Sequence, residues 1–137
     1  MILVDTGPLV AAANAADRRH ADSVLALSQI RGPRLVPGPV IAETCYLLAR
    51  EAGARVEAAF LRSFASGYLQ TVELTAADLA RAADLVEQYS DLPLGGTDAC
   101  VVALAERLDI DQIATLDVRH FSVVRPSHGR AFTLLPS

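Results

Sequence analysis

The sequence predicts a single α/β domain, in which a central and mostly parallel sheet of about five strands is flanked by helices. Three observations support this prediction. The chain has 137 residues, which suits one domain and is too short for two. Hydrophobic residues make up 52% of it, enough for a substantial core. Short apolar runs alternate with segments of helical periodicity, as in βαβ units. We therefore expect one domain over residues 1–137, without a linker or an internal repeat.

The expected strands are short apolar runs, because a parallel strand buried on both faces shows little polar alternation. The first run follows Met1 at once and ends at Asp5. The second precedes the turn-forming segment 37–39. The expected strands cover residues 2–4, 35–36, 69–74, 113–116 and 131–135.

The expected helices have apolar residues at helical spacing and recognisable start or stop signals. One begins after the Pro-Gly-Pro segment 37–39 and is stopped by Gly53. Another begins at Thr75 and Asp78, which have the spacing of a capping box. The expected helices cover residues 17–30, 40–52, 56–65, 76–89 and 97–108.

The composition excludes several classes of function. All 12 basic residues are Arg, which removes P-loop and Schiff-base chemistry because both need Lys. The dinucleotide and hydrolase-elbow glycine motifs are also absent. The 3 histidines are not spaced for a structural zinc site. Cys45 and Cys100 lie far apart, which predicts two reduced thiols in a cytoplasmic protein.

Charge and hydropathy bound the partners and the compartment. No apolar stretch reaches the length of a membrane span, and no basic leader precedes the first strand, so we expect no membrane association. A net charge of −4 does not suit a protein that coats nucleic acid by bulk attraction. Residues 118–137 nevertheless carry Arg119, Arg125 and Arg130 and no acidic residue. This tract either contacts RNA or a protein partner, or is a solvated terminal loop, and the sequence leaves both open.

Four acidic residues stand where apolar segments meet turns or helices: Asp5, Glu43, Asp98 and Asp117. Asp5 and Asp117 end strand-like runs, and such positions meet at the carboxyl edge of a parallel sheet. Asp98 opens a helix, and Glu43 lies in the first turns of another. Four like charges in one place repel strongly and need a cation. Carboxylates with no His or Cys among them suit Mg²⁺ or Mn²⁺. The sequence therefore predicts a metal site.

The motifs around these acids resemble the PIN-domain ribonucleases, and more narrowly the VapC toxins of bacterial toxin–antitoxin pairs. The likeness covers essentially the whole chain, and the ordered set is specific although each short motif alone is weak. By this resemblance the four acids match the family's acidic quartet, and Thr6 and Thr115 match its hydroxyl positions near the metal. Arg119, His120 and Phe121 fall where the family has a short turn ending in an aromatic residue. The matching segments are residues 2–7 (ILVDTG), 40–43 (VIAE), 97–99 (TDA) and 114–117 (ATLD).

The resemblance implies a PIN-like fold and a metal-dependent endoribonuclease that acts on transfer RNA or ribosomal RNA. A cognate antitoxin would neutralise it by wrapping its helical groove, the toxin would form a homodimer, and DNA would be contacted only through the antitoxin. Independent chemistry agrees, because a bound Mg²⁺ or Mn²⁺ supplies both a deprotonated water and charge neutralisation at the phosphate. We expect Asp5 and Asp98 to be direct ligands, with Glu43 and Asp117 completing the site of one or two ions.

Other interpretations stay open at this point. Asp98 stabilises a helix N-terminus in any case, Asp117 is a common turn-former, and Asp5 can cap the next helix. A second enzyme class is an aspartyl-phosphate phosphotransferase with Asp5 as nucleophile. Its pattern wants a second Asp where Gly7 stands, and the missing Lys weakens it further. A third reading is a catalytically inactive PIN-like module that binds protein or RNA.

Overall fold

The computed structural model describes residues 1–136 and confirms the predicted α/β fold class. Five strands form one sheet in the order β3-β2-β1-β4-β5, and each neighbouring pair is parallel. Each strand overlaps one of the five predicted runs, so the strand prediction is confirmed. The strands are β1 (Ile2–Val4), β2 (Arg34–Pro37), β3 (Gln70–Val72), β4 (Gln112–Ala114) and β5 (Thr133–Leu135).

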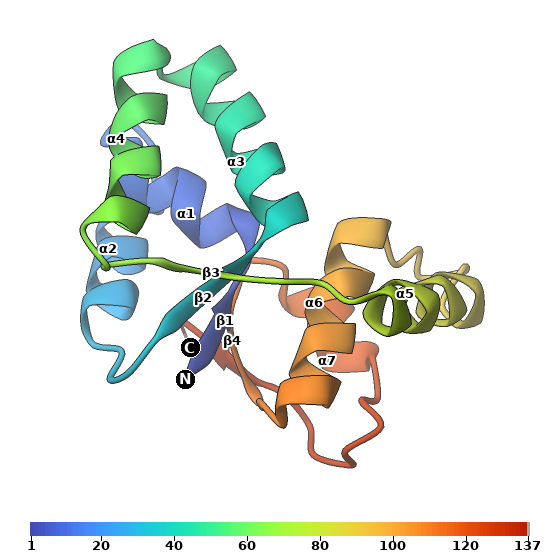
Figure 1. The fold of residues 1–137 in the computed structure, drawn as a ribbon. Coiled ribbons are helices and arrows are strands. Elements are labelled where there is room, and N and C mark those ends of the chain that lie inside the picture. Colours follow the sequence, from blue (N-terminus) through green and yellow to red (C-terminus); the bar gives the residue numbers. More distant parts are fainter. Residues whose placement is uncertain (137) are drawn as a thin grey trace.

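Seven helices are described within residues 1–136, and they cover both faces of the sheet. Figure 1 shows α1, α2 and α4 on one side of the strands and α5, α6 and α7 on the other, while α3 rises from the end of β2 and pairs with α4. None of these helices is long and apolar enough to cross a membrane. They are α1 (Thr6–Ala13), α2 (His20–Ser28), α3 (Gly38–Glu51), α4 (Ala54–Ala65), α5 (Ala76–Gln88), α6 (Gly96–Leu108) and α7 (Val118–Val123).

The chain builds the sheet outward from β1 in two directions. It first adds β2 and β3 on one side, then crosses to β4 and β5 on the other. The direction switches between β1 and β4, and ligands of such sheets bind beyond the carboxyl ends of the strands at that point. Asp5 follows β1 directly and Asp117 lies shortly after β4. The topology therefore places two of the predicted acids at the switch point.

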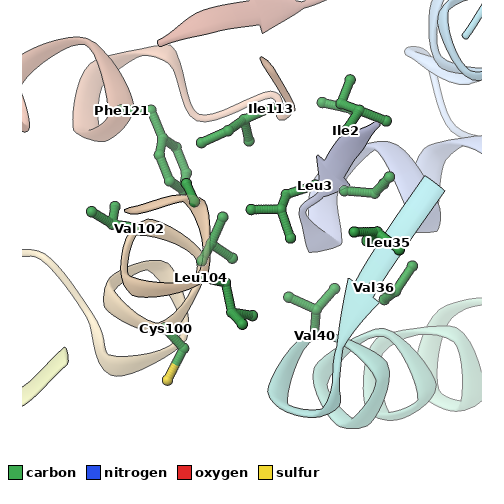
Figure 2. Packing of buried hydrophobic residues seen from close by; sticks show 14 of the residues in the cluster. Ile2, Leu3, Leu35, Val36, Val40, Cys100, Val102, Leu104, Ile113 and Phe121 are labelled. Carbon is green, nitrogen blue, oxygen red and sulfur yellow. The ribbon is translucent and has the colours of Figure 1, made fainter. Parts of the chain in front are cut away.

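The core holds the site-bearing helices against the central strands. Figure 2 shows side chains of β1, α6 and α7 gathering around Leu3, Leu104 and Phe121, and all three are buried. Ile113 of β4 is fully buried in the same cluster. Burying one such side chain contributes about 1.5–3 kcal/mol. The amino ends of α6 and α7 are thereby fixed in place beside the sheet edge.

Two helices, α1 and α7, are absent from the sequence-based prediction. Helix α1 is buried on most of its circumference, including Pro8, Leu9, Val10 and Ala11, so it lacks the polar face that reveals a surface helix. Helix α7 has only 6 residues, too few to show a period. It stands where a short turn was expected at residues 119–121. Both helices begin directly after a candidate site residue, Asp5 and Asp117.

Candidate functional site

The structure brings the four predicted acids, Asp5, Glu43, Asp98 and Asp117, to one open pocket of about 740 Å³. It lies beyond the carboxyl ends of β1 and β4, between the base of α3 and the amino end of α6. Thr6 also lines it. The remaining lining residues come from α1, α3, the amino end of α6 with its N-cap residue, and the loop after β4: Gly7, Leu47, Gly95, Gly96, Thr97 and Leu116.

A buried threonine joins the acids of the two central strands. The Thr115 hydroxyl donates to Asp5 Oδ2 at 2.9 Å and accepts from the backbone N–H of Asp117 at 2.9 Å. The backbone N–H of Asp5 also donates to the Ala114 carbonyl oxygen at 2.9 Å. Thr115 is 1% exposed and Asp5 is 6% exposed. Thr115 thus fixes the orientation of the Asp5 carboxylate and the position of Asp117.

Gly7 allows α1 to start close to the loop after β4. A Cβ at Gly7 would lie 3.2 Å from Cβ of Leu116 and 3.3 Å from its Cγ, tighter than ordinary van der Waals contact. Leu116 directly precedes Asp117. The absence of a side chain at Gly7 therefore lets Asp5, at the N-cap of α1, approach Asp117, at the N-cap of α7.

Burial and electrostatic repulsion raise the pKa values of Asp98 and Asp5. Burial, followed by the charges of Asp5 and Asp117, raises the pKa of Asp98 to about 7, while His120 acts in the opposite direction. Burial also raises the pKa of Asp5, and the charges of Glu43 and Asp117 add to this, against the hydrogen bond from Thr115. Asp98 lies in the first turn of α6, whose N-terminal dipole favours a negative charge. The helix dipole does not offset the burial of Asp98 and its repulsion by the neighbouring acids, because the pKa of Asp98 is still raised.

Glu43 and Thr6 complete the lining in different ways. Glu43 is exposed on α3 at the mouth of the pocket, and its charge contributes to the raised pKa values of Asp5 and Asp98. Thr6 is 5% exposed, and its hydroxyl oxygen has no hydrogen-bond partner among residues 1–136. The hydroxyl of Thr6 is therefore a free donor and acceptor next to the acids. Burying a hydroxyl without a hydrogen-bond partner costs free energy.

His120 is a candidate site residue that the sequence-based prediction did not include. Ligand atoms of Asp98, Asp117 and His120 all lie within 4.8 Å of one another. Nδ1 of His120 contacts Oδ2 of Asp117 and lies 3.6 Å from Oδ2 of Asp98. The sequence-based prediction named carboxylates alone, and the structure places an imidazole beside two of them. The available signal was the three-residue spacing from Asp117, which places both side chains on one face once α7 is known to be helical.

The basic residues Arg119, Arg125 and Arg130 do not line the acidic pocket. Arg130 forms ion pairs with Asp109 and Asp111 at 2.8 and 3.3 Å. Arg119 and Arg125 are exposed and donate to backbone carbonyl oxygens nearby. Their role as contacts for RNA or a partner stays a prediction.

The residues present fit a divalent cation. The pocket offers carboxylate oxygens without an arginine, since no ion pair within residues 1–136 joins an arginine to Asp5, Glu43, Asp98 or Asp117. Mutual repulsion among such groups is what a bound cation relieves. Asp5 and Thr6 are consecutive residues and both are buried. The Asp5 carboxylate and the Thr6 hydroxyl therefore offer oxygen ligands on the inner wall of the pocket. Oxygen donors of this kind suit Mg²⁺ or Mn²⁺.

These features define a class: single-domain α/β proteins with a carboxylate pocket at the switch point of a parallel sheet. Comparison with known proteins identifies the family. The sequence model of the PIN domain matches residues 2–125. Ribonuclease VapC26 of Mycobacterium tuberculosis is 37% identical over 135 residues, which cover 98% of this chain and 100% of that protein. The chain therefore belongs to the PIN-domain family and, within it, to the VapC-type proteins.

Solved structures support the fold assignment. The sarcin-ricin loop cleaving toxin VapC20 of Mycobacterium tuberculosis superposes with a TM-score of 0.77 at 24% identity, over 82% of this chain and 87% of that chain. A chain of VapBC2 from Rickettsia felis, solved bound to a promoter DNA fragment, gives a TM-score of 0.66 at 17% identity, over 98% of this chain and 97% of that one. At these identities the likeness concerns the fold alone.

Proposed function

We propose that this protein is a metal-dependent endoribonuclease, the toxin of a VapBC-type toxin–antitoxin pair. The observation that carries the proposal is the meeting of Asp5, Glu43, Asp98 and Asp117 at one open pocket. Membership of the PIN-domain family and the similarity to a ribonuclease support the choice of RNA as substrate. By the same family resemblance, we propose transfer RNA or ribosomal RNA as the target class.

In this proposal the pocket holds Mg²⁺ or Mn²⁺, with Asp5 and Asp98 as direct ligands and Glu43 and Asp117 completing the site. When bound, such an ion lowers the pKa of a water molecule and neutralises charge on the scissile phosphate. Thr115 keeps the Asp5 carboxylate oriented, because its hydroxyl donates to Oδ2. The hydroxyl of Thr6, which has no other partner within residues 1–136, is available to orient a water or a phosphate oxygen.

By the family resemblance, the proposed partner is a cognate antitoxin, which would wrap a helical groove and place a basic side chain in the acidic pocket. A cavity of about 320 Å³ lies between α1, α2 and α4, and Leu9, Leu27, Val56 and Phe60 contribute to its wall. An amphipathic helix fits such a groove. We further propose a cytoplasmic homodimer that contacts DNA only through the antitoxin. Light scattering on the purified protein checks the dimer, and a 14.5 kDa species at working concentration would refute it.

The experiment is cleavage of total cellular RNA by purified, antitoxin-free protein with Mg²⁺, with Mn²⁺ and with EDTA. We expect discrete fragments that need a metal and disappear in Asp5→Asn and Asp98→Asn. The matched control is Asp91→Asn, which removes an exposed carboxylate that does not line the pocket and should leave cleavage unchanged.

Three outcomes contradict the proposal. Cleavage that persists in EDTA and in both site variants would show that the acids do not support catalysis. Intact RNA from a folded preparation that binds metal would favour the inactive binding module. A stable phosphoryl group on Asp5 after incubation with a phosphate ester would instead favour the phosphotransferase.

A further inference from the structure

The carboxylate pocket has an imidazole at its side. His120 offers a ring nitrogen within 4.8 Å of carboxylate oxygens from both Asp98 and Asp117, which come from different helices. The side chain of His120 is 22% exposed, that of Asp98 is 19% exposed and that of Asp117 is 33% exposed. All three are therefore held by the protein and still reachable from solvent.

The orientation of His120 is fixed by its neighbours in α7. Asp117 caps the helix, because its Oδ1 accepts the backbone N–H of His120 at 3.1 Å. The other oxygen, Oδ2, contacts Nδ1 of the ring. Phe121, the next residue, is 1% exposed and anchors the helix in the core near Ile113 (Figure 2). The contact with Asp117 therefore holds the ring toward the acids.

A hydrogen bond between His120 and Asp117 does not account for the whole arrangement. One ring N–H can serve one carboxylate, and Oδ2 of Asp98 at 3.6 Å is beyond hydrogen-bond distance. The Asp98 carboxylate thus lies close to Nδ1 of His120 without forming a hydrogen bond with it. Ligand bonds of about 2.0–2.2 Å let one cation join donor atoms that lie roughly 4 Å apart. An ion bound here would replace the direct contact between Nδ1 of His120 and Oδ2 of Asp117, and would take these two atoms and Oδ2 of Asp98 as ligands.

We propose that His120 is a nitrogen ligand of the metal centre, and that the centre consequently binds Mn²⁺ in preference to Mg²⁺. This inference rests on the proposed function, since it refines the same site. Mg²⁺ is held almost entirely through oxygen and keeps its waters. Imidazole is a ligand of transition-metal ions rather than of Mg²⁺, and Mn²⁺ is the transition-metal ion that also suits carboxylates. Adding His120 to the carboxylates of the centre therefore favours Mn²⁺ over Mg²⁺. Asp5 and Glu43 provide the oxygen-only side of the pocket.

The most direct test begins with the wild-type protein. Pulsed electron paramagnetic resonance of the Mn²⁺-loaded wild-type protein should show coupling of the electron spin to a ¹⁴N nucleus. The coupling should vanish in His120→Ala and persist in His128→Ala. His128 is a matched control because it lies in the same C-terminal segment, contacts the Ile110 carbonyl oxygen at 3.0 Å and is not part of the cluster. Bound Mn²⁺ without nitrogen coupling in the wild type would overturn the inference.

Metal affinities give an independent readout. By calorimetry, His120→Ala should weaken Mn²⁺ binding by about tenfold or more, the lower end of the loss seen even for groups that only support ligands. Mg²⁺ binding should weaken much less, so the ratio of the two affinities should fall. An unchanged ratio would mean that His120 serves only as a hydrogen-bond partner of Asp117, and would overturn the inference. Circular dichroism confirms that the variant is folded.

Failure of this inference is distinguishable from failure of the proposed function. Mn²⁺ that binds, is lost in Asp98→Asn and shows no nitrogen coupling leaves the carboxylate centre standing and removes His120 from it. A wild-type protein that binds no divalent cation contradicts both.

Discussion

Two groups of acidic residues in this domain have opposite surroundings. On α5 and α6, Asp78 and Glu106 are each held by an arginine. Arg107 Nε donates to both carboxylate oxygens of Asp78 at 2.9 and 3.0 Å. Arg81 donates to both oxygens of Glu106 at 2.8 and 3.0 Å. At the carboxyl edge of the sheet, the pocket acids have no arginine partner within residues 1–136.

The pKa values of Glu106 and Asp98 follow this difference. Burial disfavours the charged form of Glu106, but the hydrogen bonds from Arg81 and from the backbone of Ser127 outweigh it, so the pKa of Glu106 is lowered. The pKa of Asp98 is raised to about 7, first by burial and then by neighbouring acids. Paired carboxylates of the first kind hold two helices together. The pocket acids, which have no arginine partner within residues 1–136, are kept together at a cost to the metal-free protein, which is typical of functional sites.

The largest expected effect breaks the pocket. Asp98→Asn should reduce RNA cleavage by roughly a thousandfold, about 4 kcal/mol of transition-state stabilisation, because it removes a charge that holds the catalytic ion. Its thermal stability without metal should be equal to or higher than that of the wild type, since a repelled charge is gone. Initial rates and thermal melts in EDTA measure the two quantities. A large loss of stability would mean that Asp98 stabilises the fold, as the arginine-paired Asp78 and Glu106 do.

The second prediction concerns the arginine-paired acids on α5 and α6. Glu106→Gln should lower the free energy of unfolding by about 1.5–3 kcal/mol, because hydrogen bonds to a charged group are lost at a side chain only 7% exposed. Metal affinity and RNA cleavage at low temperature should stay unchanged, since Glu106 does not line the pocket. Urea denaturation and calorimetry test this. Weaker metal binding in Glu106→Gln would show that the two regions are coupled.

An intermediate effect is expected at Thr115, which supports the pocket from within the core. Thr115→Val keeps the shape but removes the hydroxyl that donates to Asp5 and accepts from the Asp117 backbone. Metal affinity should fall by about 10–100-fold, as for other groups that orient ligands. Thr115→Ser, which keeps the hydroxyl, should recover most of it. Equal affinities in the Val and Ser variants would argue against an orienting role for the hydroxyl.

The same contrast explains how much of the molecule the sequence could predict. The strands and the positions of the four acids follow from apolar runs and their ends, and the Thr75–Asp78 capping box is present as predicted. The arginine partners of Asp78 and Glu106 lie 29 and 25 positions away, so no local pattern identifies them. The contribution of His120 was hidden because α7 is too short to show periodicity. Local signals therefore predicted the five strands and five of the seven helices within residues 1–136, whereas α1, α7 and the pairing across elements needed the structure.

The smallest expected effect is a difference in the pH dependence of stability, measured in EDTA. The folded-state pKa of Asp98 is raised from 3.8 to about 7, so its proton is bound more tightly in the folded protein than in the unfolded chain. The stability contributed by that proton is fully present below pH 3.8 and is lost as the pH rises through about 7. The shift corresponds to at most about 4 kcal/mol, at 1.36 kcal/mol per pKa unit.

Because 19% of the Asp98 side chain is exposed, solvent screening should reduce this to about 1–2 kcal/mol. Urea denaturation from pH 5 to 8 should therefore show the wild-type protein losing more stability with rising pH than Asp98→Asn, whose side chain does not titrate. Glu106, with its lowered pKa, acts in the opposite sense, since its contribution is lost as the pH falls through its folded-state value. Adding Mn²⁺ should flatten or reverse the wild-type slope, because the ion binds the deprotonated acids. If stability falls with pH equally in the two proteins in EDTA, the pKa of Asp98 is not raised in the folded protein. The contrast between the pocket acids and the arginine-paired acids would then fail.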